Sequence, residues 1–133
     1  MAESWYVFLA ASDPLEQIVD RIAAIMRVPF HPCTPADARC YEAHTPYARI
    51  TIFGDHGFEH DRDMPFEDYP YAIEICAIRD RHLATNVEQA AQWATRLFEQ
   101  LKATDRYSLV LVWDVQQKLQ EHHPSSRAHS TQF

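Results

Sequence analysis

The run Trp5–Ala10 constrains the fold most, because it is apolar on both of its faces. In an extended strand successive side chains point to opposite faces, so Trp5, Val7 and Leu9 share one face and the residues between them share the other. A strand of this kind needs cover on both sides, which is typical of the interior of a sheet. We therefore expect Trp5–Ala10 to be a central strand.

Two later segments have the period of an amphipathic helix. Residues 12–14 (Ser-Asp-Pro) form a helix start signal, and apolar residues then recur at three- and four-residue steps from Leu15 to Met26. Residues 85–88 (Thr-Asn-Val-Glu) match a capping box, and a second apolar stripe runs from Val87 to Leu101. Each segment predicts a helix that packs its stripe on a sheet.

The remaining regular segments are extended. Pro29, Pro32 and Pro35 end the first helix and predict an extended linker. Residues 39–53 follow, interrupted at Thr45-Pro46, where the positive φ of a two-residue hairpin is hard to reach. We expect one kinked or bulged edge strand there, with Pro46 on its unpaired side. Further strands are predicted at residues 71–79 and 107–115.

The expected order of elements is β-α-β-β-α-β, which is a split βαβ or ferredoxin-like arrangement. It predicts an α+β fold in which an antiparallel sheet carries two helices on one face. The other face would expose aromatic residues such as Tyr6 and Phe8, which a second copy, a partner or the C-terminal segment would cover. The length of 133 residues fits one domain, expected at 1–122. Residues 116–122 are expected as a short helical extension and 123–133 as a flexible tail.

The chain's charge is concentrated between Gly54 and Pro70. This acidic segment holds six carboxylates against Arg62, a formal charge of −5 out of the −7 of the whole chain. An acidic chain with few lysines does not favour binding to nucleic acid or to an anionic membrane. A basic protein is the more natural partner.

Two groups of side chains resemble metal sites by residue type. The first is His31, Cys33, Cys40 and His44, whose ligand types suit zinc but whose spacing does not. The second is Asp55, His56, Glu59, His60 and Asp63, which does not match a calcium loop or a helical zinc motif. We expect neither group to hold a metal and expect no cofactor, although a small metal-dependent enzyme remains a minor alternative.

Other catalytic chemistry has little support in the sequence. Glu74 lies in the middle of an expected strand, where a solvated or paired carboxylate is the simpler interpretation than a general acid. No nucleophile motif is present, and the two glycines of the chain exclude a glycine-rich phosphate loop. We therefore expect a protein that is not an enzyme.

The cysteines and the N-terminus bear on location. Cys33, Cys40 and Cys76 are an odd number without close pairing, which suggests free thiols in a reducing compartment. The N-terminus is acidic before a short apolar run, unlike a signal peptide or a membrane span. We expect a cytoplasmic protein that does not bind membranes.

Aromatic residues are interleaved with the carboxylates of the acidic segment. Buried aromatic side chains contribute most of the binding free energy of many protein interfaces, so these residues could anchor a partner. Their alternative role is to pin a long loop onto the domain. The expected partner-binding residues are Asp55, Phe58, Glu59, Asp61, Asp63, Phe66, Glu67, Asp68 and Tyr69.

The small size, acidic balance, single α/β domain and absence of motifs resemble the immunity proteins of bacterial polymorphic-toxin and contact-dependent inhibition systems. The resemblance implies a protein that binds and neutralises a cognate toxin, with carboxylates presented to a basic cleft such as that of a nuclease. An alternative is a ferredoxin-like regulatory or small-ligand-binding domain that forms a homodimer through its sheet.

Overall fold

The first strand lies inside the sheet, as its doubly apolar sequence predicts. In the computed structural model, β1 (Ser4–Ala10) pairs antiparallel with β5 (Tyr71–Ala77) on one side and with β6 (Ser108–Trp113) on the other. Trp5, Val7 and Leu9 are buried in the larger core, whereas Phe8 belongs to a second buried cluster on the opposite face. The central position of this strand is therefore confirmed.

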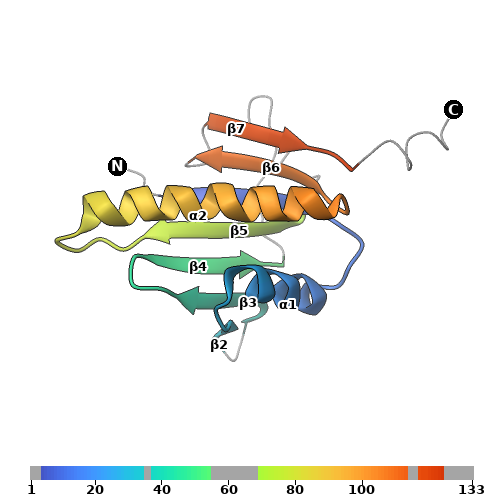
Figure 1. The fold of residues 1–133 in the computed structure, drawn as a ribbon. Coiled ribbons are helices and arrows are strands. Elements are labelled where there is room, and N and C mark those ends of the chain that lie inside the picture. The colour runs from blue at the N-terminus through green and yellow to red at the C-terminus, as the bar shows by residue number, and fades with distance from the viewer. Residues whose placement is uncertain (1–3, 35–36, 55–68, 114–116, 125–133) are drawn as a thin grey trace, which may run out of the picture.

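The structure describes residues 4–34, 37–54, 69–113 and 117–124. Within them the fold is α+β, with one seven-stranded antiparallel sheet in the order β2-β3-β4-β5-β1-β6-β7 and two helices (Figure 1). The remaining elements are α1 (Leu15–Met26), β2 (His31–Thr34), β3 (Asp37–His44), β4 (Ala48–Phe53), α2 (Leu83–Thr104) and β7 (Gln117–His122).

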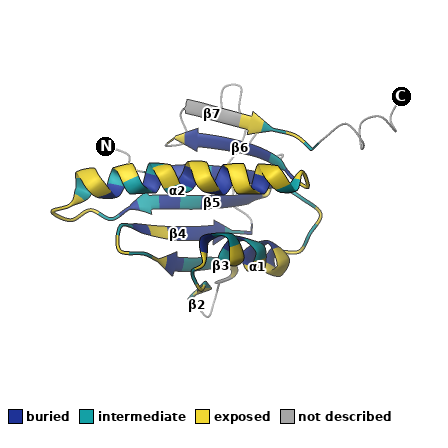
Figure 2. Cartoon of the chain, viewed as in Figure 1, coloured by how far each residue is buried: buried dark blue, intermediate teal, exposed yellow. Residues whose placement is uncertain are grey.

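Both helices cover the same face of the sheet, as expected (Figure 1). Each buries the predicted apolar stripe: Leu15, Ile18, Val19, Ile22 and Met26 in α1, and Ala90, Ala94, Leu97, Phe98 and Leu101 in α2. Figure 2 shows buried central strands behind helices whose outer turns are exposed. The small alanines of α2 let the helix lie close to the sheet.

The helix starts differ from those the sequence predicts. α2 begins at Leu83, ahead of the expected capping box, and neither helix has a side-chain cap. Asn86 lies buried within α2 and donates to the Ile78 carbonyl at 2.9 Å and to Asp80 Oδ1 at 3.0 Å. Before α1, the Asp13 carboxylate accepts a hydrogen bond from the Tyr107 hydroxyl at 3.2 Å. Asn86 thus bonds to the loop just before α2, and Asp13 bonds to a tyrosine far away in the sequence, instead of to free helix N–H groups.

The prediction of one edge strand across residues 39–53 is wrong. β3 and β4 form an antiparallel hairpin in which His44 pairs with Arg49. Thr45 closes the turn, because its Oγ1 accepts from the Ala48 N–H at 3.0 Å and its own N–H donates to the Ala48 carbonyl at 2.9 Å. Three residues connect the strands, so the connection is not a two-residue turn that needs positive φ, which in the described residues other than glycine occurs only at Arg27 and Asp105.

Two more edge strands replace segments expected to be a linker and a helix. The proline-rich stretch after α1 contains β2, which pairs with β3, and Pro32 is tolerated there because β2 is an edge strand. Residues 117–122 form β7 on β6 instead of a helical extension. The four-strand sheet expected from the sequence is therefore too small. The expected tail lies mostly outside the described residues, and the domain limits stay a prediction.

Candidate functional site

The acidic segment connects two neighbouring strands. β4 and β5 are paired, with Phe53 opposite Ala72, so Gly54 and Tyr69 lie at the same end of this strand pair. Most of the expected contact residues lie outside the described residues: Asp55, Phe58, Glu59, Asp61, Asp63, Phe66, Glu67 and Asp68, and with them His56 and His60. What the structure shows is how the segment begins and ends.

Gly54 fixes the beginning of the segment. Its N–H donates to the Arg39 carbonyl at 2.7 Å, and its own carbonyl accepts from Arg39 Nη2 at 2.8 Å. A Cβ at this position would stand 2.9 Å from both Arg39 Nη2 and Leu15 Cδ2. A larger residue here would therefore have to displace the ends of the Arg39 and Leu15 side chains.

Tyr69 fixes the end of the segment. It is only 7% exposed and lies on the helix-free face of the sheet in one buried cluster with Phe8, Ala72, Val110 and Val112. Of the two roles open to the aromatic residues of the segment, Tyr69 has the anchoring one. Tyr69 is also one of the expected contact residues, and contact with a partner stays a prediction for it.

The helix-free face is polar beside this cluster. Glu74 accepts hydrogen bonds from Ser4 Oγ and Tyr6 Oη, each at 3.1 Å, and Tyr6 is its cross-strand partner on β1. Thr51, its partner on β4, is buried. Glu74 is thus tied to hydroxyl groups across strands. This arrangement holds the carboxylate in place by hydrogen bonds.

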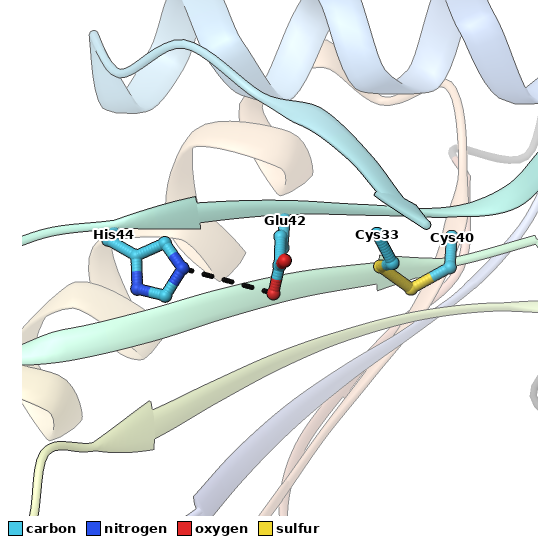
Figure 3. Close-up of a disulfide and its surroundings, with 4 residues drawn as sticks. All are labelled: Cys33, Cys40, Glu42 and His44. Atoms are coloured by element: carbon cyan, nitrogen blue, oxygen red, sulfur yellow. Dashed lines mark ion pairs between the residues drawn. A yellow bond between two sulfur atoms is a disulfide. The ribbon is translucent and has the colours of Figure 1, made fainter. Parts of the chain in front are cut away.

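The first metal candidate loses two ligands to a disulfide. Cys33 on β2 and Cys40 on β3 are joined, with their Cα atoms 5.4 Å apart (Figure 3). Their sulfurs are therefore not free to bind zinc, and the expectation of three free thiols is wrong. His44 instead lies 3.9 Å from the Glu42 carboxylate (Figure 3). Across the described ranges, no three His, Cys, Asp or Glu side chains are grouped as metal ligands.

A groove that the sequence did not predict lies between the two helices. We call it the arginine groove; its volume is about 720 Å³. Its lining residues are Arg21, Ala24, Ile25, Met26 and Arg27 of α1 and its C-cap, and Trp93, Arg96, Gln100 and Thr104 of α2. The three arginines flank the apolar stripes of helices that are distant in sequence. Only the packing of the helices brings them together.

Tyrosines lie next to two of these arginines. Burial raises the pKa of Tyr107. The nearby positive charge of Arg21 lowers this pKa by a smaller amount, and the hydrogen bond to Asp13 raises it. Burial likewise raises the pKa of Tyr47, and the charge of Arg96 offsets only part of this rise. Both phenols are therefore neutral at physiological pH, and the positive charge of the arginines is not compensated by them.

Comparisons with known proteins do not indicate a function for this site. No protein-family model, curated protein or solved structure matches the chain. In the part of the chain that the structure describes, no helix combines the length and the hydropathy needed to cross a membrane.

Proposed function

We propose that this chain is an immunity-type protein that binds and neutralises a basic toxin through its acidic segment, residues 54–70. The observation that carries the proposal is the concentration of charge, −5 of −7, in a stretch whose two ends are held on the sheet. Gly54 is held by hydrogen bonds and Tyr69 by burial. Carboxylates gathered in this way attract a basic cleft and accelerate encounter with it.

The rest of the described surface offers little for apolar docking. Trp113, at 39%, is the one large hydrophobic side chain that is well exposed among the described residues. Phe8 and Val112 on the helix-free face are fully buried within the chain. A homodimer through this face, which the alternative function requires, would therefore gain little from these residues. We also propose that β6-β1-β5-β4 is a ferredoxin-like unit, extended by strands at both edges.

The partner follows from the charge. A cognate toxin with a basic, nucleic-acid-binding cleft is the best match, and this chain itself is not expected to bind nucleic acid. Cytoplasmic location stays a prediction. The argument from free thiols no longer supports it, since disulfides such as Cys33–Cys40 persist mainly in oxidising compartments. The neutralising role does not depend on which compartment holds the protein.

The test is a pull-down from cells that make the protein, followed by binding measurements with the purified partner. In the segment variant, Asp61, Asp63, Glu67 and Asp68 are changed to Asn or Gln. The matched control changes four exposed carboxylates of the helices, namely Glu16, Asp20, Glu88 and Glu99, in the same way. We expect the segment variant to lose the basic partner and the control to retain it. Equal capture by both variants would contradict the proposal.

A further inference from the structure

The arginine groove gathers three arginines, and no ion pair among the described residues involves them. Arg21, Arg27 and Arg96 line it, and none of its lining residues is a carboxylate. Among the described residues the ion pairs involve other groups, such as Arg106 with Asp13. Three guanidinium groups around one hollow repel one another and favour a bound anion.

Two of the three guanidinium groups are held by aromatic rings. The Arg96 guanidinium lies 5.1 Å from the centroid of the Trp93 ring, and that of Arg21 lies 6.0 Å from the centroid of Tyr107. Trp93 is itself stacked on Tyr47, with 6.4 Å between ring centroids. Because these contacts restrict the side chains before a ligand arrives, less conformational freedom is lost on binding.

Arg21 also has an unsatisfied donor. Its Nε is buried and has no hydrogen-bond partner in the described structure. A buried donor without an acceptor costs free energy, so such groups are rare and call for an explanation. Because this nitrogen has almost no accessible surface, a ligand oxygen in the groove would reach it only after the Arg21 side chain turns toward the groove.

The shape of the groove fits a small molecule. Its volume of about 720 Å³ falls within the range of about 300–1,000 Å³ typical of small-ligand sites. Ala24, Ile25 and Trp93 add apolar surface beside the arginines. Arginine forks match the oxygen atoms of phosphate groups, to which they donate paired hydrogen bonds.

We propose that the arginine groove binds a small organic phosphate. The phosphate oxygens accept hydrogen bonds from the three guanidinium groups, and the apolar body of the ligand lies against Ala24 and Ile25. This site has the opposite charge to the acidic segment and is built from the helices. Phosphate binding in the groove can therefore be tested separately from toxin binding.

The experiment is an NMR titration of ¹⁵N-labelled protein with phenyl phosphate. The indole N–H signal of Trp93 should move, with a Kd below about 1 mM, while that of Trp113 stays in place. Inorganic phosphate should bind more weakly, because it lacks the apolar body, and phenol should not bind, because it lacks the anion. If the Trp93 signal stays in place up to about 10 mM phenyl phosphate, the proposal is wrong.

Variants connect the binding to the arginines. Arg96→Gln and Arg27→Gln should each weaken phenyl phosphate about tenfold, since each removes a charge-assisted hydrogen-bond donor. Arg81→Gln removes the same charge from an exposed residue outside the groove and should leave the Kd unchanged. Arg27 and Arg96 are both exposed, so neither change should prevent folding, and the two variants test the assignment independently. Binding that is unaffected by Arg27→Gln, or weakened equally by Arg81→Gln, would overturn the assignment.

Discussion

Replacing Tyr69 with alanine tests whether the acidic segment is anchored to the sheet. Tyr69 is 7% exposed and packs in the cluster that contains Phe8 and Val112. Truncating a buried aromatic side chain to alanine removes its transfer free energy and leaves a cavity, at a cost of about 3–5 kcal/mol. Because the side chain sits at the end of the segment, where the surroundings can partly relax, we expect the lower end of this range, about 3 kcal/mol.

The assay is urea unfolding followed by tryptophan fluorescence, with the free energy of unfolding extrapolated to water. Trp113→Ala is the control, since it removes an even larger but exposed aromatic side chain and should cost less than about 1 kcal/mol. A loss below about 1 kcal/mol for Tyr69→Ala would refute the packing described for Tyr69.

Three further predictions concern the rest of the fold. Thr45→Val should destabilise the chain by about 1–2 kcal/mol in urea unfolding, because it removes the hydroxyl that closes the β3–β4 turn. The same change at exposed Thr95 should cost much less, and equal losses would contradict this role for Thr45. Denatured, unreduced protein should show one reactive thiol, and three after reduction of Cys33–Cys40; three before reduction would contradict the disulfide. The pKa of Tyr107 is raised above its ordinary 10.0 in the folded state, so its contribution to stability should be constant below pH 10 and be lost as the pH rises above it. Tyr107→Phe should make that fall less steep, and an unchanged slope would count against the pKa shift.

The inner part of the fold is predictable because each of its elements carries a local pattern. Val7, with an apolar neighbour on either side, indicates a strand covered on both faces. The stripes that end at Met26 and Leu101 indicate helices with one buried face. Burial in these elements follows directly from the period of the apolar residues.

The edges of the sheet were missed because they depend on contacts that a local pattern does not contain. The turn at Thr45 is closed by its own side chain, and rules for two-residue turns do not cover that case. β2 and β7 are polar edge strands without alternation, and each forms because an unpaired strand edge lies next to it. The Cys33–Cys40 disulfide likewise needs the β2–β3 pairing, which sequence spacing alone does not reveal.

The candidate sites likewise combine a feature that local sequence predicts with features that depend on long-range contacts. The charge of the acidic segment is visible in the sequence, whereas the burial of Tyr69 is not, because its aromatic ring suits an anchor and an interface equally well. The arginine groove is invisible in sequence, since Arg21 and Arg96 are close only after the helices pack on the sheet.

The most direct test of toxin binding is the association rate of this chain with its captured basic partner, measured at increasing salt concentration. If the carboxylates of the acidic segment steer the encounter, the rate constant should fall steeply between about 10 mM and 150 mM salt. The Asp61, Asp63, Glu67 and Asp68 variant should associate about tenfold more slowly at low salt and lose most of the salt dependence. A variant that associates as fast as the unmodified protein, with the same salt dependence, would contradict binding through the acidic segment.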